Sequence, residues 1–178
     1  MARTLLHSAG NAIVVSTFLT FGSSRTALAV TIDCETMTAA SAASVMGVPK
    51  ARSNPPGSHS KQPPDNMDVF GCSYAEVSPD PLARTMVYTV YTPIPKDLGS
   101  VFASLSHPNI PGKPVSFSPG IGTGSTGWVR LSANGETYDG SIVFQGASNI
   151  VVVRVSGMPS GDAAKSALVK AGNILAKS

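Results

Sequence analysis

Apolar residues recur at helical spacing near the C-terminus. The stripe consists of Ala164, Ala167, Leu168, Ala171, Ile174 and Leu175. Because residues three and four positions apart share one face of an α-helix, this spacing predicts an amphipathic helix. Ser160 is placed to cap its first turn, and Asp162 complements the positive end of the helix dipole. We expect this helix to continue to about Ala176.

Upstream of this helix, several segments are typical of β-strands, because apolar and polar residues alternate in them or because they are rich in β-branched and aromatic residues. The predicted strands are 70–77, 85–92, 115–118, 128–132, 138–145 and 150–156. The Asn134-Gly135 pair accommodates the positive φ values of a tight hairpin turn. Since short turns join antiparallel strands, the last three strands predict a β-meander.

Two shorter helices are predicted before the meander. Thr38 is placed to cap a helix over 39–46, and Gly47 suits its left-handed end. Pro95 suits the first position of the second helix, whose apolar residues at helical spacing are Leu98, Val101, Phe102 and Leu105. Between the first helix and the first strand, residues 52–68 contain four prolines and almost no apolar side chain, which predicts a flexible Pro-rich loop.

These elements predict a single α+β domain over residues 30–178. We expect an antiparallel β-sheet of about five to six strands, with the two short helices and the C-terminal helix packed on one face. A chain of this length, roughly 150 residues, is long enough to form one hydrophobic core.

Residues 1–29 have the layout of a signal peptide. Arg3 supplies a positive charge, an interrupted apolar stretch follows within 12–21, and Ala27-Leu28-Ala29 has the small-x-small pattern of a cleavage site. The apolar stretch is shorter than the about 20 residues that span a bilayer. We therefore expect cleavage near Ala29 and a secreted or periplasmic protein without a transmembrane span. A buried N-terminal helix or a membrane anchor is the alternative.

The chain contains two cysteines, Cys34 and Cys72. An even number of cysteines in an exported domain predicts a disulfide, here between the N-terminal segment and the first strand. Two free thiols or a metal site are the alternatives. His59 and His107, however, lie at spacings that match no zinc motif. We expect the disulfide, no metal and no cofactor.

Composition and charge argue against two classes of protein. The formal net charge is +3, and removal of Arg3 and Arg25 with the signal peptide lowers it to +1. A nearly neutral balance argues against a nucleic-acid-binding protein. With 13% charged and 42% apolar residues, the chain is also too apolar and too weakly charged to be disordered throughout.

No catalytic motif has the sequence context that it needs. Residues 122–127 match G-x-G-x-x-G, but they precede a predicted strand, whereas a dinucleotide site requires a helix there. The G-x-S-x-G pattern is missing, and His59 and His107 lie in proline-rich loops. We predict no catalytic residues. The alternative is a hydrolase whose residues lie on loops, such as Ser125 with His107.

One face of the meander is the best candidate for a binding surface. Strand alternation directs a set of residues away from the helices, namely Trp128, Arg130, Val143, Gln145, Val152 and Arg154. A tryptophan beside two arginines can stack on a ring and pair with an anion, and such residues are enriched at interfaces. We therefore predict that Trp128, Arg130 and Arg154 bind a ligand or partner. The structural alternative is that an arginine covers the indole by cation–π packing.

The layout of the chain resembles that of a group of small exported bacterial cell-envelope domains. Cys34 precedes a Thr-capped short helix that ends in glycine, a second cysteine lies in Gly71-Cys72-Ser73-Tyr74, and an alanine-rich helix follows the meander. The group includes domains of unknown function and extracellular sensor-like domains of bacterial serine/threonine kinases. The likeness spans most of residues 34–176 and implies a binding or sensing role without defining a ligand.

We therefore expect an exported, non-enzymatic domain that binds a small ligand or a protein of the bacterial envelope. Two alternatives remain open. One is the secreted hydrolase with loop-borne catalytic residues, and the other is a protease inhibitor that presents the loop 52–68 to its target.

Overall fold

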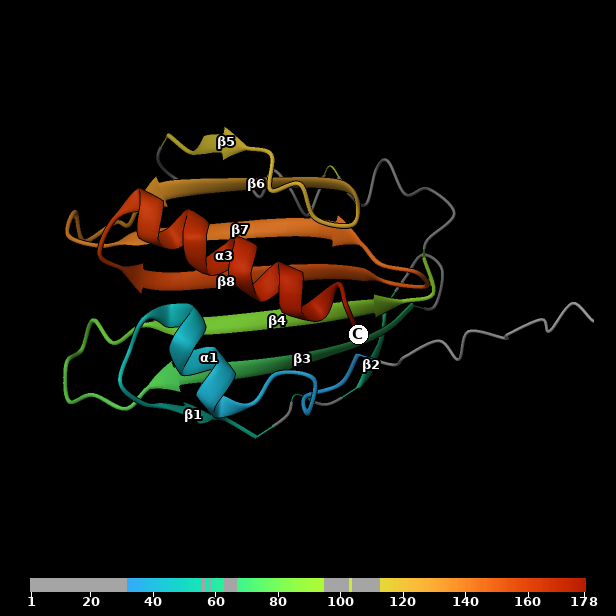
Figure 1. Cartoon of the computed structure of the whole chain (residues 1–178), viewed down its shortest axis with the longest axis horizontal. Helices are drawn as coiled ribbons and strands as arrows, with labels where there is room; N and C mark the ends of the chain where they lie inside the picture. The colour runs from blue at the N-terminus through green and yellow to red at the C-terminus, as the bar shows by residue number, and fades with distance from the viewer. Residues whose placement is uncertain (1–31, 56, 58, 63–66, 95–102, 104–112) are drawn as a thin grey trace, which may run out of the picture.

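The computed structural model describes residues 32–55, 57, 59–62, 67–94, 103 and 113–178. Within these residues the chain forms one antiparallel sheet, and two helices lie on one of its faces (Figure 1). The predicted signal peptide over 1–29 lies outside the described residues. So does the predicted helix that begins at Pro95, apart from Ala103.

Among the described residues the sheet has eight strands, and every pairing between them is antiparallel. They are β1 (Ala51–Ser53), β2 (Ser60–Gln62), β3 (Met67–Glu76), β4 (Thr85–Thr92), β5 (Val115–Phe117), β6 (Thr123–Leu131), β7 (Tyr138–Gln145) and β8 (Ile150–Met158). Their order is β1-β3-β4-β8-β7-β6-β5, and β2 also pairs with β3. The last strand of the chain therefore lies in the middle of the sheet, between β4 and β7 (Figure 1).

The antiparallel sheet and the C-terminal helix are confirmed, but the expected number of five to six strands is wrong. The two additional strands, β1 and β2, lie within the predicted loop 52–68 or at its start, and each has only three residues. Both pair with β3, at opposite ends of that strand. Backbone hydrogen bonding defines these strands, and three residues are too few to show an alternating pattern in the sequence.

The main hydrophobic core lies between the sheet and the helices α1 (Ala39–Met46) and α3 (Gly161–Leu175). The predicted stripe of α3 is buried there, with Leu168 and Leu175 fully covered and Ile174 at its margin. The sheet contributes Cys72, Tyr74, Met86, Tyr88, Val90, Ile142, Phe144, Val151, Val153 and Val155. The two helices also contact each other, so together they form one layer over the sheet (Figure 1).

Both helices begin at the predicted caps. The Thr38 side chain accepts a hydrogen bond from the Ser41 N–H, and the Ser160 side chain accepts one from the Ala163 N–H. Gly47 ends α1 in the left-handed conformation with φ 67°. Arg84 adds two hydrogen bonds that the sequence does not reveal, because its guanidinium donates to the carbonyls of Met46 and Gly47. These contacts tie the end of α1 to the start of β4.

The N-terminal segment is fastened to the sheet by a disulfide and by two tyrosines. Cys34 and Cys72 form the predicted disulfide, with their Cα atoms 5.5 Å apart. The Tyr74 hydroxyl donates to the carbonyl of Met37, and the Tyr88 hydroxyl donates to that of Asp33. A disulfide is compatible with the predicted extracellular location. Within the described part of the chain, neither helix has the length and hydrophobicity needed to cross a bilayer.

Candidate functional site

The three residues predicted to bind a ligand lie on the face of the sheet opposite the helices. Trp128 on β6 pairs with Ser141 on β7, and Ser141 pairs in turn with Arg154 on β8. These three side chains therefore form a row across neighbouring strands. Arg130 pairs with Asp139 in the next row. Strand alternation thus assigned Trp128, Arg130 and Arg154 to the correct face.

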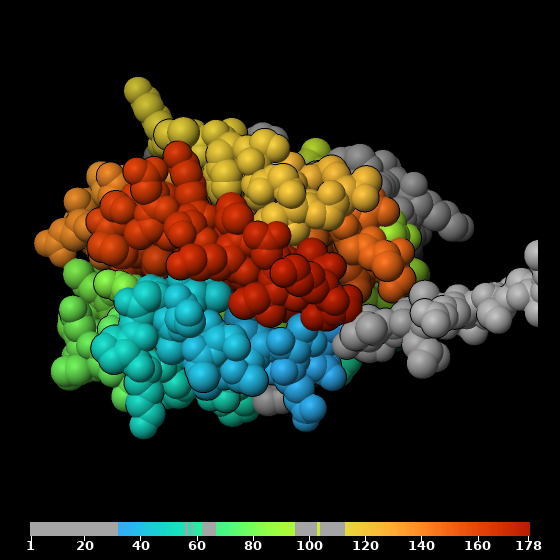
Figure 2. Space-filling view, in the orientation of Figure 1, coloured from blue at the N-terminus to red at the C-terminus, as the bar shows by residue number. Residues whose placement is uncertain are grey.

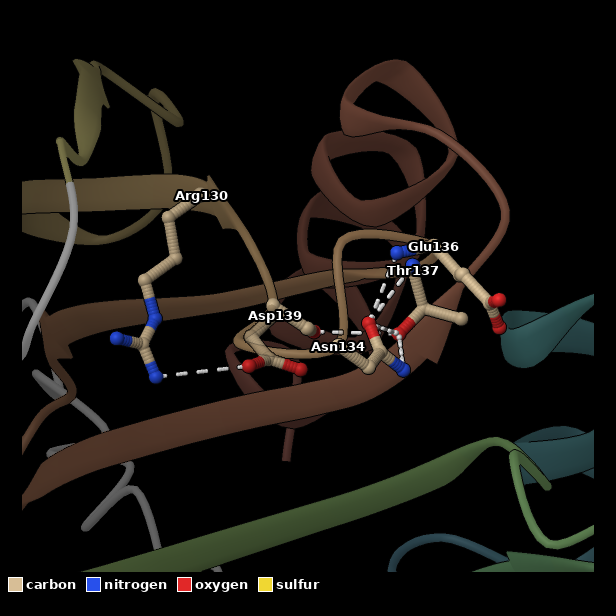
Figure 3. Close-up of polar contacts among 6 residues, drawn as sticks. Arg130, Asn134, Glu136, Thr137 and Asp139 are labelled. Atoms are coloured by element: carbon tan, nitrogen blue, oxygen red, sulfur yellow. Dashed lines mark hydrogen bonds and ion pairs between the residues drawn. The ribbon is translucent and has the colours of Figure 1, made fainter.

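The register of β6 and β7 is fixed by the turn that joins them. The Asn134 side-chain oxygen accepts hydrogen bonds from the N–H groups of Glu136 and Thr137, at 3.0 and 3.2 Å (Figure 3). Gly135 adopts the positive φ, 73°, that the Asn-Gly pair predicts. Because a slip of one residue would move every side chain to the other face, this turn determines which residues share the site.

Arg130 makes contacts with two of its neighbours in the structure. One nitrogen of its guanidinium, Nη2, lies 3.5 Å from Oδ2 of Asp139 (Figure 3). The side chains of this ion pair are only 16% and 22% exposed. The Arg130 Cζ atom also lies 5.8 Å from the centroid of the Trp128 ring. The cation–π contact that the sequence left as a structural alternative is therefore present, and it holds the indole beside the ion pair.

Trp128 and Ser141 bury polar atoms that have no hydrogen-bond partner. Trp128 is 8% exposed and Ser141 is 1% exposed. Neither the indole Nε1 nor the Ser141 Oγ has a partner within the described part of the chain. Most buried polar groups in proteins are paired, and leaving one unpaired costs about 1–3 kcal/mol. Two such atoms on directly opposite residues therefore mark this place as unusual.

Arg154 contributes a positive charge next to these two atoms. Its side chain is exposed, and no ion pair to it occurs among the described residues. Burial raises the pKa of Tyr91 on β4, and the charge of Arg154 acts in the opposite direction. Arg154 lies on β8, the strand that pairs with β4, so its positive charge faces the same side of the sheet as Tyr91.

Of the remaining residues of the predicted face, Gln145 is half-buried, whereas the two valines are buried in an apolar cluster. Val143, Ile150 and Val152 form a second hydrophobic cluster, against which Tyr91 packs. Val143 and Val152, which the alternation grouped with the binding residues, are each 1% exposed. The candidate site is therefore smaller than the predicted face. It comprises Trp128, Arg130, Asp139, Ser141 and Arg154, and we refer to it as the Trp128 cluster.

Two members of the Trp128 cluster were missed in the sequence. Ser141 and Asp139 carry no motif, and serine and aspartate are common on strand surfaces and in turns. The signal that could have found them is the Asn-Gly turn, because counting outward from it pairs Arg130 with Asp139 and Trp128 with Ser141.

The chemistry of the Trp128 cluster favours binding an acceptor. An indole N–H, a hydroxyl and two guanidinium groups supply hydrogen-bond donors. The single carboxylate in the cluster, that of Asp139, is engaged by Arg130. The cluster therefore carries one net positive charge and more donors than acceptors.

The other candidates from the sequence lie elsewhere. The Ser125 hydroxyl accepts a hydrogen bond from the Ile121 N–H at 2.9 Å, while its proposed partner His107 lies outside the described residues. His59 is exposed, stacks on Phe70 and lies 3.3 Å from a carboxylate oxygen of Asp68. Among the residues that the structure describes, no group of three or more histidines, cysteines and acids could hold a metal.

Two grooves border α1 on the helix-covered side, which Figure 2 shows in space-filling form. The larger, about 480 Å³, runs along α1 beside Val48 and Lys50, and the smaller, about 380 Å³, lies between α1 and α3 beside Val45 and Lys170. Alanines and serines line much of both grooves. Neither groove contains an acid, a histidine or a buried unpaired polar atom among its lining residues.

Comparison of this chain with protein-family models, with curated proteins and with solved structures found no significant match. The class of protein is therefore defined by its own fold and site. In the part of the chain that the structure describes, it is an antiparallel sheet with two helices on one face and a cluster of hydrogen-bond donors on the other.

Proposed function

We propose that this chain is an exported, non-enzymatic binding domain of the bacterial envelope, and that the Trp128 cluster is its binding surface. The observation that carries the proposal is the pair of unpartnered buried atoms, Trp128 Nε1 and Ser141 Oγ, beside the exposed charge of Arg154. Unpartnered buried polar groups are rare in native proteins, and a bound group that supplies the missing partner is one of the explanations for them. The disulfide between Cys34 and Cys72 supports the exported location.

Binding fits the Trp128 cluster better than catalysis. A serine nucleophile needs a general base within hydrogen-bond distance, and the Ser141 hydroxyl has none among the described residues. Guanidinium groups stay protonated at ordinary pH, so Arg130 and Arg154 can hold and orient a group but are poor general acids and bases. The cluster therefore supplies attraction and orientation.

The test uses the fact that the chain contains a single tryptophan. We would titrate residues 30–178, with the disulfide formed, with sugars, amino acids, short peptides and small anions. Fluorescence excited at the red edge of tryptophan absorption and the single indole N–H signal in NMR spectra both report on Trp128 alone. At least one class of compound should shift this signal saturably, together with backbone signals of β6, β7 and β8.

Two variants separate specific binding from a general effect of charge. Arg154→Gln should weaken the binding, whereas Arg52→Gln should not. Both arginines are exposed and strand-borne, but Arg52 lies on β1 at the far edge of the sheet. Binding that leaves the Trp128 signal unchanged would contradict the proposed surface. Turnover of ester, peptide or glycoside substrates would favour the hydrolase alternative, and inhibition of a protease that is lost on cleavage within 52–68 would favour the inhibitor.

A further inference from the structure

The two unpartnered atoms of the Trp128 cluster require an acceptor. The indole Nε1 is a donor only, and a hydroxyl both donates and accepts. Opposing residues in an antiparallel pair have Cβ atoms about 4.5–5.5 Å apart, so the register places the Trp128 and Ser141 side chains next to each other. If the indole donated to the Ser141 hydroxyl, the hydroxyl proton would still need an acceptor. In every arrangement the pair therefore lacks at least one acceptor.

The charges next to this pair decide which kind of acceptor fits. Arg154 pairs with Ser141 in the register of β8 and β7, and Arg130 lies next to the indole. Figure 3 shows that Arg130 is already engaged by Asp139. Guanidinium groups bind anionic oxygens more strongly than neutral ones and often in a bidentate manner. A neutral acceptor such as a carbonyl or a water would satisfy the donors but would gain less from the neighbouring charge of Arg154 than an anion does.

We propose that the Trp128 cluster binds the carboxylate group of a small ligand, with Trp128 Nε1 and Ser141 Oγ as donors and Arg154 as the balancing charge. This inference rests on the proposed function and names the ligand class for the same surface. The cluster carries one net positive charge, which matches the single negative charge of a carboxylate. A phosphate monoester carries about −1.5 to −2 at neutral pH and would be left with excess negative charge.

The experiment compares each carboxylate with its neutral amide at constant ionic strength. The probes are acetate against acetamide, benzoate against benzamide and N-acetylglycine against its amide, with inorganic phosphate as a separate titration. The readout is the Trp128 indole N–H signal of the disulfide-bonded protein, residues 30–178. We expect saturable shifts with the carboxylates, affinities at least about tenfold weaker with the amides, and weaker binding of phosphate.

Variants test the assigned roles. Arg154→Gln and Ser141→Ala should each weaken carboxylate binding by about tenfold or more, since each removes a donor to the anion. Arg52→Gln should leave the affinity unchanged. Because Arg154 is exposed, its substitution should not impair folding, and thermal unfolding of each variant verifies this.

The outcomes distinguish this inference from the proposed function. If amides bind as well as carboxylates, or if phosphate binds more tightly, the assignment of a carboxylate is wrong. If none of the carboxylates shifts the indole signal while other compounds do, the inference fails but the proposed binding surface remains. If no compound shifts this signal, both fail.

Discussion

Leu168 of α3 packs directly on Gly140 of β7. A Cβ atom at Gly140 would lie 2.8 Å from Leu168 Cδ1 and 3.0 Å from the carbonyl oxygen of Trp128. The helix therefore approaches the sheet where the strand has no side chain. The next residue of the same strand, Ser141, faces the opposite side and carries the unpartnered hydroxyl of the Trp128 cluster. Packing of α3 on one face of the sheet thus fixes the position of the β7 backbone, which carries Ser141 on the other face.

Gly140→Ala should destabilise the protein by about 1–3 kcal/mol, because the added methyl group forces the helix or the strand to move. Gly71→Ala is the matched control, since it also lies within a strand and its Cβ would approach nothing closer than the Tyr88 carbonyl oxygen at 3.5 Å. The measurement is the midpoint of urea unfolding. Equal midpoints for the two variants would mean that α3 moves away from the sheet at little cost.

Leu168→Ala should cost about 2–5 kcal/mol, since Leu168 is fully buried and its removal leaves a cavity between helix and sheet. Asn173→Ala, on the exposed side of the same helix, should change the free energy of unfolding only slightly. Denaturant unfolding of both variants tests the packing of α3. A negligible effect of Leu168→Ala would contradict it.

The sequence predicts elements well where a periodic pattern and a terminating residue agree. The helix 39–46 and the strands 85–92 and 138–145 have the predicted bounds, because caps, glycine or turn residues delimit them. The short strands β1 and β2 were missed, because their pairing with β3 depends on backbone hydrogen bonds between distant residues. Local patterns contain no information on such pairing.

The candidate site was predictable only in part, for a similar reason. Alternation is a local property, so it assigned Trp128 and Arg154 to one face. The burial of Trp128 and the unpartnered state of its Nε1 depend on what surrounds it in three dimensions. Ser141 became a candidate only when the register placed it between these two residues.

Loss of the disulfide should cost roughly 2–5 kcal/mol. Cys34→Ser/Cys72→Ser should still fold, because hydrogen bonds from Tyr74 and Tyr88 also hold the N-terminal segment. Urea unfolding of the wild type with and without reductant gives the effect of the bridge, and the double variant serves as a control that reductant cannot change. A wild type with equal stability in both redox states would show that the bridge does not constrain the fold.

Stability should fall at alkaline pH. Burial raises the pKa of Tyr74, Tyr88 and Tyr91 above the ordinary value of 10.0. In the unfolded chain these phenols ionise near pH 10, whereas in the folded protein they stay protonated, so unfolding releases protons. Their contribution is therefore fully present below about pH 10 and decreases as the pH rises further.

The alkaline effect is measured by urea unfolding at increasing pH, together with phenolate absorbance. Tyr88→Phe should reduce the slope of stability against pH above about pH 10, since one proton fewer is released. Ionisation of these three tyrosines near pH 10 in a protein that is still folded would contradict the expected shifts.

Ser141→Ala should raise stability by about 1 kcal/mol, because it removes a buried hydroxyl that has no partner. Ser73→Ala is the matched control. Ser73 lies on β3 in the same row across the sheet, but its hydroxyl accepts a hydrogen bond from the Asn54 side chain at 3.1 Å. Loss of this hydrogen bond in Ser73→Ala should therefore leave the free energy of unfolding unchanged or slightly lower.

The two serine variants should also differ in carboxylate binding. Ser141→Ala should gain stability and lose affinity, a combination typical of polar groups that are kept for a ligand at the expense of the fold. Ser73→Ala should retain the affinity of the wild type. The opposite result would be a Ser141→Ala variant that is the less stable of the two and binds carboxylates normally. The Ser141 hydroxyl would then have a structural partner, and the protein itself would supply the acceptor that the Trp128 cluster requires.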